Sequence, residues 1–135
     1  MLGLNWAMKR MVGQVEVELY APEPYSRLSL QERSDICDGC GTRGWKGKIV
    51  PDNIFGLSIK EACNIHDYMY YVGQTIQDKQ EADRTFLNNI LRCIDASDSY
   101  WFMDIIRRKR AFTYYNAVVM FGGQHSGKER TIRRT

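Results

Sequence analysis

The chain has 135 residues and a mass of 15.7 kDa, with 44% hydrophobic and 26% charged residues, a composition that fits one folded domain and excludes wholesale disorder. It contains no run of about 18 apolar residues, so no membrane-spanning helix is predicted, and its first 20 residues lack the features of a signal peptide. The formal net charge is only +3, but residues 107–135 carry eight basic side chains and one acidic side chain.

The first predicted elements are a short strand and a helical turn. Polar and apolar residues alternate over residues 14–19, which is typical of a strand with one buried face. Pro22 and Pro24 then interrupt regular structure, and residues 28–32 are expected to form a brief helical turn. Residues 37–56 contain five glycines and are predicted to form a long loop. Loops of this length in a compact domain are usually either functional or disordered.

Two helices are predicted after this loop. Ser58 begins a capping-box sequence, so the first helix should start there and run to about Tyr71, where Gly73 stops it. Thr75 begins a second capping box, which predicts a helix that reaches about Ile94. The short link between the helices predicts an antiparallel pair. The second helix has an apolar stripe with a period near 3.6 residues, formed by Ala82, Phe86, Leu87, Ile90, Leu91 and Ile94.

A third helix is predicted near the C-terminal end. Ser97 or Asp98 can cap its start, and it is expected to end near residues 122–123. The basic run 107–110 interrupts its apolar pattern. Its buried side is expected to consist of Trp101, Phe102, Ile105, Ile106, Phe112, Val119 and Met120. The chain is therefore predicted to form one domain over residues 1–123, followed by a flexible basic tail over residues 124–135.

The first helix of the pair carries side chains that could take part in catalysis or metal binding. Residues three and four apart on a helix are neighbours, so Cys63, His66, Asp67 and Tyr70 should share one face. Asp83 lies at the margin of the apolar stripe on the second helix and could approach that face. A carboxylate bonded to one imidazole nitrogen fixes the tautomer and leaves the other nitrogen as a base near neutral pH. The alternative is that Asp83 is a solvated surface acid.

These segments resemble the secreted-type phospholipases A2. Cys63-Asn-Ile-His66-Asp67-Tyr-Met-Tyr70 is similar to the active-site helix of that family, whose pattern is Cys-x-x-His-Asp-x-x-Tyr. The glycine-rich segment 39–44 resembles its calcium loop, and Ala82-Asp83-Arg84 resembles its second-helix Asp segment. The resemblance covers residues 37–95 and implies a divergent bacterial, phage or viral-type member. The fold implied is mainly α: an antiparallel helix pair with a calcium loop, a third helix and a short N-terminal strand.

The function implied by the resemblance is calcium-dependent hydrolysis of the sn-2 ester of glycerophospholipids. His66 would be the general base that activates a water molecule, and Asp83 would orient His66 with help from Tyr70. The main-chain N–H of Gly41 would donate to the oxyanion. No serine-nucleophile motif of the Gly-x-Ser-x-Gly type is present, which is consistent with direct attack by water.

The resemblance also implies a calcium site and a disulfide. The ligands would be one carboxylate and three main-chain carbonyls, from Asp67, Gly39, Gly41 and Arg43. The disulfide would join Cys40 to Cys63. Arg43 departs from the family pattern, which has two adjacent glycines at this point, and a non-glycine residue adopts positive φ less readily.

Other interpretations remain open from the sequence. A zinc ion bound by Cys37, Cys40, Cys63 and His66 would fit the spacing of a structural Cys3His site. Cys37 and Cys93 could also pair with each other or stay free. A third hypothesis keeps the phospholipase-like fold but makes the domain an inactive binding or structural module.

The expected partner is a phospholipid membrane surface. Arg107, Arg108, Lys109 and Arg110 could contact anionic lipid, although a solvated helix face would explain the same run. No nucleic-acid-binding module is recognised, so no nucleic-acid partner is expected. Association with a phage or virion, or secretion by another route, would be compatible with the absence of a signal peptide.

Overall fold

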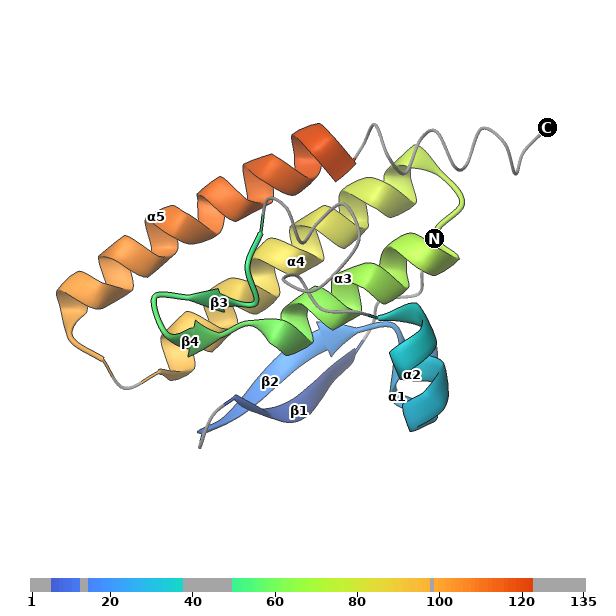
Figure 1. Cartoon of the computed structure of the whole chain (residues 1–135), viewed down its shortest axis with the longest axis horizontal. Helices are drawn as coiled ribbons and strands as arrows, with labels where there is room; N and C mark the ends of the chain where they lie inside the picture. The colour runs from blue at the N-terminus through green and yellow to red at the C-terminus, as the bar shows by residue number, and fades with distance from the viewer. Residues whose placement is uncertain (1–5, 13–14, 38–49, 98, 123–135) are drawn as a thin grey trace.

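The computed structural model describes residues 6–12, 15–37, 50–97 and 99–122, and within these ranges the side chains from Glu16 onward other than that of Phe121. In this part of the chain the structure is mainly helical, with two small antiparallel sheets (Figure 1). None of the described helices is long and apolar enough to cross a bilayer. The glycine-rich segment 38–49 and the predicted tail 124–135 lie outside the described residues.

The N-terminal sheet is a hairpin. Strand β1 (Trp6–Val12) pairs with β2 (Val15–Ala21) in a register that runs from Trp6 opposite Ala21 to Val12 opposite Val15. The sequence predicted β2 but not β1. In β2 the predicted alternation is present, because Val17 and Leu19 are buried while Glu16 and Glu18 are exposed. The buried side of β2 packs against the long helix α4 (Ile76–Ala96).

Two short helices follow the hairpin, α1 (Glu23–Ser26) and α2 (Leu30–Ile36). The helical turn was predicted over residues 28–32, so the prediction begins and ends earlier in the chain than α2 does. Ser29 is the N-cap of α2, and its side chain and that of Glu32 form a reciprocal capping box. The cap therefore sets where α2 begins, and α1 was not predicted.

The second hairpin shortens the predicted loop. Strands β3 (Asn53–Ile54) and β4 (Leu57–Ser58) pair across a turn in which Phe55 and Gly56 have φ values of 50° and 83°. The expected helix start at Ser58 is wrong, because Ser58 belongs to β4. The next residue, Ile59, is still held to the main-chain oxygen of Asp52 at 2.8 Å, and the helix begins one residue later.

The predicted antiparallel helix pair is present as α3 (Lys60–Val72) and α4 (Ile76–Ala96). Gly73 ends α3 as expected, and the Thr75 capping box starts α4, which continues two residues past the predicted end. The Asp78 side chain accepts hydrogen bonds from the main-chain N–H groups of Gln74 and Thr75. These bonds lower its carboxyl pKa, although burial opposes the shift. The predicted stripe on α4 faces the core, with Leu87 and Leu91 half-buried.

The last helix, α5 (Trp101–Ala117), continues into one π-helical segment, η2 (Val118–Gly122). Its N-cap is Tyr100 rather than Ser97, which caps the end of α4, and Asp98 lies outside the described residues. The predicted buried side of this helix is wrong. All seven of its members are exposed: Trp101, Phe102, Ile105, Ile106, Phe112, Val119 and Met120.

The face of α5 that is buried instead is centred on a charged residue. Arg107 is only 9% exposed, and Ala111, Tyr114 and Val118 continue the same face. The Arg107 guanidinium donates from Nε to the main-chain oxygen of Ile54 at 3.2 Å and from Nη2 to that of Phe55 at 2.8 Å. Its Nη1 donates to Ser99 Oγ at 3.1 Å. These three hydrogen bonds fix which side of α5 faces the β3–β4 hairpin.

Asn89 is a buried tie between α4 and β2. Its Oδ1 accepts from the Tyr20 main-chain N–H at 2.8 Å, and its Nδ2 donates to the Tyr20 main-chain oxygen at 2.9 Å. Asn89→Ala leaves both partly buried main-chain groups of Tyr20 without these partners, so it is expected to lower the free energy of unfolding by about 2–3 kcal/mol. Urea titration followed by circular dichroism measures the loss. The exposed neighbour Asn88 is the matched control, and equal effects of Asn88→Ala and Asn89→Ala would contradict the prediction.

Candidate active site

Helices α3 and α4 bring a histidine and a carboxylate together in the interior. His66 Nε2 lies 2.8 Å from Asp83 Oδ1, and each residue is only 1% exposed. Tyr70, one turn after His66, donates from its hydroxyl to the same Asp83 oxygen at 2.7 Å. The structure therefore places these three predicted site residues in direct contact, and Asp83 is not a solvated surface acid.

Aromatic rings surround the imidazole. The ring centroid of His66 lies 4.3 Å from that of Tyr70 and 4.7 Å from that of Phe86. Phe86 comes from α4, three residues after Asp83, so α4 supplies both the carboxylate and an apolar contact for the imidazole. Packing and hydrogen bonding together fix the orientation of His66, as a positioned base requires.

A lysine that the sequence analysis did not single out completes the carboxylate's surroundings. Lys79 Nζ donates to Asp83 Oδ2 at 2.5 Å, and its side chain is 13% exposed. The signal for it was available, because Lys79 and Asp83 are four residues apart on one helix. Lys79 Nζ also donates to the main-chain oxygen of Val119 in η2 at 3.4 Å. The end of the C-terminal helical region is thereby connected to the site.

Asp83 is held in its charged form by its partners. Burial acts to raise the pKa of the Asp83 carboxyl, but the hydrogen bond and charge interaction with His66, together with the hydrogen bonds from Lys79 and Tyr70, outweigh it, and the pKa lies below its ordinary value. An ionised carboxylate can only accept, so Nε2 of a neutral His66 carries the hydrogen in this pair. This assignment makes Nδ1 the basic nitrogen of the imidazole.

The predicted metal ligands are only partly within the described residues. Asp67 follows His66 on α3 and is half-buried. Gly39, Gly41 and Arg43 lie outside the described residues, and so does the predicted oxyanion donor of Gly41. Within the described residues, no group of three or more His, Cys, Asp or Glu side chains is arranged to hold a metal ion. The predicted calcium site does not depend on such a cluster, because its other ligands are main-chain carbonyls.

The cysteines differ in state. Cys63 is disulfide-bonded, and pairing with Cys40 remains a prediction because Cys40 lies outside the described residues. Cys37 and Cys93 are buried thiols in reduced form, so the possible bridge between them is absent. Cys37 Sγ donates to the main-chain oxygen of Asn64 at 3.2 Å. Burial raises the pKa of the Cys93 thiol to about 12, which makes it inert rather than nucleophilic.

The basic run on α5 does not form one continuous surface. Arg107 is buried as described above, and Arg108 is half-buried and forms an ion pair with Asp95. Only Lys109 and Arg110 are exposed. The expectation that all four cations contact lipid is therefore wrong for Arg107, whose donors are used inside the fold.

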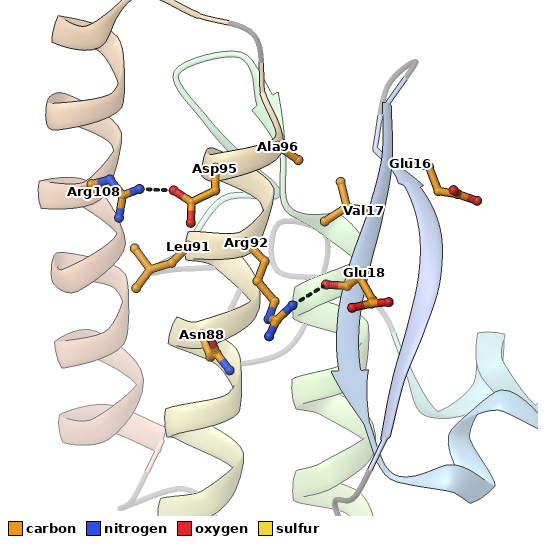
Figure 2. A pocket seen from close by; sticks show the side chains of 9 residues that line it. All are labelled: Glu16, Val17, Glu18, Asn88, Leu91, Arg92, Asp95, Ala96 and Arg108. Atoms are coloured by element: carbon orange, nitrogen blue, oxygen red, sulfur yellow. Dashed lines mark hydrogen bonds and ion pairs between the residues drawn. The ribbon is translucent and has the colours of Figure 1, made fainter.

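A surface hollow lies apart from the His66–Asp83 pair, between β2, α4 and α5 (Figure 2). Its lining consists of Glu16, Val17, Glu18, Asn88, Leu91, Arg92, Asp95, Ala96 and Arg108. The two arginines are already engaged, since Arg92 donates to the main-chain oxygen of Glu18 at 3.3 Å and Arg108 pairs with Asp95. The hollow contains none of the predicted site residues.

The contacts between α3 and α4 are of the kind by which a carboxylate can orient a histidine. Comparison with protein-family models, with curated proteins and with solved structures finds no match for this chain.

Proposed function

We propose that this protein hydrolyses the sn-2 ester of glycerophospholipids with the aid of calcium. The observation that carries the proposal is the buried contact between His66 and Asp83. Asp83 Oδ1 lies 2.8 Å from His66 Nε2 and 2.7 Å from the Tyr70 hydroxyl oxygen. These contacts support the motif resemblance, because the motif residues meet although they lie on two different helices.

The proposed reaction uses water as the nucleophile. His66 Nδ1 removes a proton from water as the water oxygen attacks the ester carbonyl. The imidazolium that forms is stabilised by the Asp83 carboxylate, and Tyr70 and Lys79 hold that carboxylate in place. The proton then passes from Nδ1 to the leaving glycerol oxygen, which returns His66 to its neutral form. The products are a fatty acid and a lysophospholipid, and no covalent intermediate with the protein is required.

Calcium fits the donor chemistry of the described part of the site. Asp67 follows His66 in the chain and carries a half-buried side chain, and carboxylate and carbonyl oxygens are the ligands that calcium prefers. The residues that would hold the ion are Asp67, Gly39, Gly41 and Arg43. When bound, calcium supplies positive charge for the substrate phosphate and the developing oxyanion.

The zinc-stapled alternative has less support. A cysteine in a disulfide has no thiolate to offer, and Cys63 is in that state. The His66 nitrogen Nε2 is bonded to Asp83, and zinc would not account for the contacts that Tyr70 and Lys79 make with the same carboxylate. The inactive-module alternative keeps this geometry and differs only in the result of an activity measurement.

The test is release of the sn-2 fatty acid from short-chain phosphatidylcholine, with calcium or with a chelator. We expect release that needs calcium, and we expect Asp67→Asn to raise the calcium concentration required by about tenfold or more, because it removes a ligand charge. Asp35→Asn, on the exposed side of α2, is the matched control and should leave the requirement unchanged. Absence of release at saturating calcium by correctly folded protein would favour the inactive module. One tightly bound zinc ion per chain would favour the zinc-stapled domain.

A further inference from the structure

The outer face of α5 is unusual for a surface helix. Its apolar members are Trp101, Phe102, Ile105, Ile106 and Phe112, and they expose between 42% and 73% of their surfaces. The opposite side of the helix, with Arg107 and Ala111, faces the rest of the protein. A surface helix ordinarily directs its polar residues to solvent, so an apolar outer face of this extent indicates that something covers it.

The charges on this face are positive. Lys109 and Arg110 are exposed and lie in the same turns as the apolar residues. They line a second surface hollow together with Phe55, Ile106 and Thr113, and this lining contains no acidic side chain. The Arg110 guanidinium lies 5.1 Å from the centre of the Phe55 ring, which keeps it near the mouth of the hollow.

Two carboxylates on α5 and at the end of α4, Asp104 and Asp95, have other partners. Asp104 is half-buried and accepts a hydrogen bond from Ser99 Oγ at 3.1 Å, while Asp95 is paired with Arg108. Lys109 and Arg110 therefore give the face a net positive charge beside its aromatic and aliphatic groups.

We propose that the outer face of α5 is a docking surface for anionic phospholipid membranes. Lys109 and Arg110 contact lipid phosphates, and the five apolar side chains enter the boundary between headgroups and acyl chains, where indole and aliphatic groups are favoured. The choice of a lipid surface rests on the proposed function. A second copy of the chain suits the face less well, because two such faces would bring like charges together.

The docking test uses vesicles that cannot be hydrolysed. Vesicles of diether phosphatidylcholine, alone or mixed in equal parts with diether phosphatidylglycerol, are sedimented with the full chain. We expect preferential binding to the anionic vesicles and about 30-fold weaker binding of the double variant Lys109→Gln/Arg110→Gln, at about 1 kcal/mol for each cation. Arg27→Gln/Lys60→Gln removes the same charge from exposed positions elsewhere and should bind as the wild type does.

A second pair of variants tests the apolar contribution. Phe102→Ser/Ile106→Ser should bind anionic vesicles at least about tenfold more weakly, because it removes apolar area that leaves water on docking. Leu30→Ser, at an exposed apolar position on α2, is the control. Equal losses in the charge control and the Lys109/Arg110 variant would overturn the proposal. So would a wild-type dimer that Phe102→Ser/Ile106→Ser dissociates while vesicle binding is absent.

Failure of docking and failure of the proposed reaction give different results. If docking through α5 is wrong but hydrolysis is right, the α5 variants hydrolyse vesicles as fast as the wild type. If hydrolysis is wrong but docking is right, diether vesicles are bound and no fatty acid is released from any ester substrate. If both proposals hold, the α5 variants lose activity on vesicles and keep it on dispersed short-chain lipid.

Discussion

Replacing Asp83 with Asn is expected to lower the turnover number for sn-2 ester hydrolysis by about 10³-fold to 10⁴-fold. The amide cannot stabilise the imidazolium, and it can donate to Nε2, which favours the tautomer with its hydrogen on Nδ1. That tautomer has no basic nitrogen directed at water. Single-turnover measurements with a short-chain ester separate this loss from changes in substrate binding.

We expect His66→Ala and the double variant His66→Ala/Asp83→Asn to have the same residual turnover number. The effects of substitutions at residues that act as one unit are not additive. Tyr70→Phe keeps the ring packed against His66 and should cost only about tenfold, the effect of one lost hydrogen bond. Tyr71→Phe, on the exposed side of α3, is the control. Multiplicative losses in the double variant would show that His66 and Asp83 do not act together.

The second large effect is on stability, at Arg107. Arg107→Met is expected to lower the free energy of unfolding by about 3–4 kcal/mol, because it leaves the buried main-chain oxygen of Ile54 and the partly buried one of Phe55 without their donors. Arg107→Lys keeps the charge but loses the planar fork, so it should lie between wild type and Arg107→Met. The midpoint of urea unfolding gives each value.

Lys109→Met is the matched control for Arg107→Met, because Lys109 is two residues away on the same helix but exposed. Its expected effect lies within about 0.5 kcal/mol of wild type. If Arg107→Met were as mild as this control, the three hydrogen bonds to the β3–β4 hairpin and Ser99 would not fix the orientation of α5.

The sequence was most informative where structure is set locally. The Thr75 capping box, the stop at Gly73 and the apolar stripe of α4 all depend on residues a few positions apart, and the α3–α4 pair was predicted from them. Strand β1 carried no comparable local signal, because its structure depends on pairing with β2. At Ser58 the local cap signal was overridden by strand pairing and by the contact between Ile59 and Asp52.

The orientation of α5 could not be read from its apolar pattern. The helix presents two candidate faces, and the more apolar one is exposed. The decision depends on Arg107, whose partners Ile54 and Phe55 are more than 50 residues away in the chain. In the candidate site, the approach of Asp83 to His66 was anticipated from the place of Asp83 at the margin of the apolar stripe in an antiparallel helix pair. The contact of Lys79 with Asp83 was missed, although its spacing within α4 was visible.

The proximity of His66 and Asp83 along the chain has a consequence for folding. Only 17 positions separate them, and a three-residue link joins their helices, so closing one helical hairpin assembles the base and its carboxylate. Contacts of such short range form early and quickly. The hydrogen bonds between Asn89 and Tyr20 of β2 join residues 69 positions apart in the chain and should form later. Substitutions at Asn89 should therefore change mainly the unfolding rate, while substitutions in the α3–α4 contact should also slow folding.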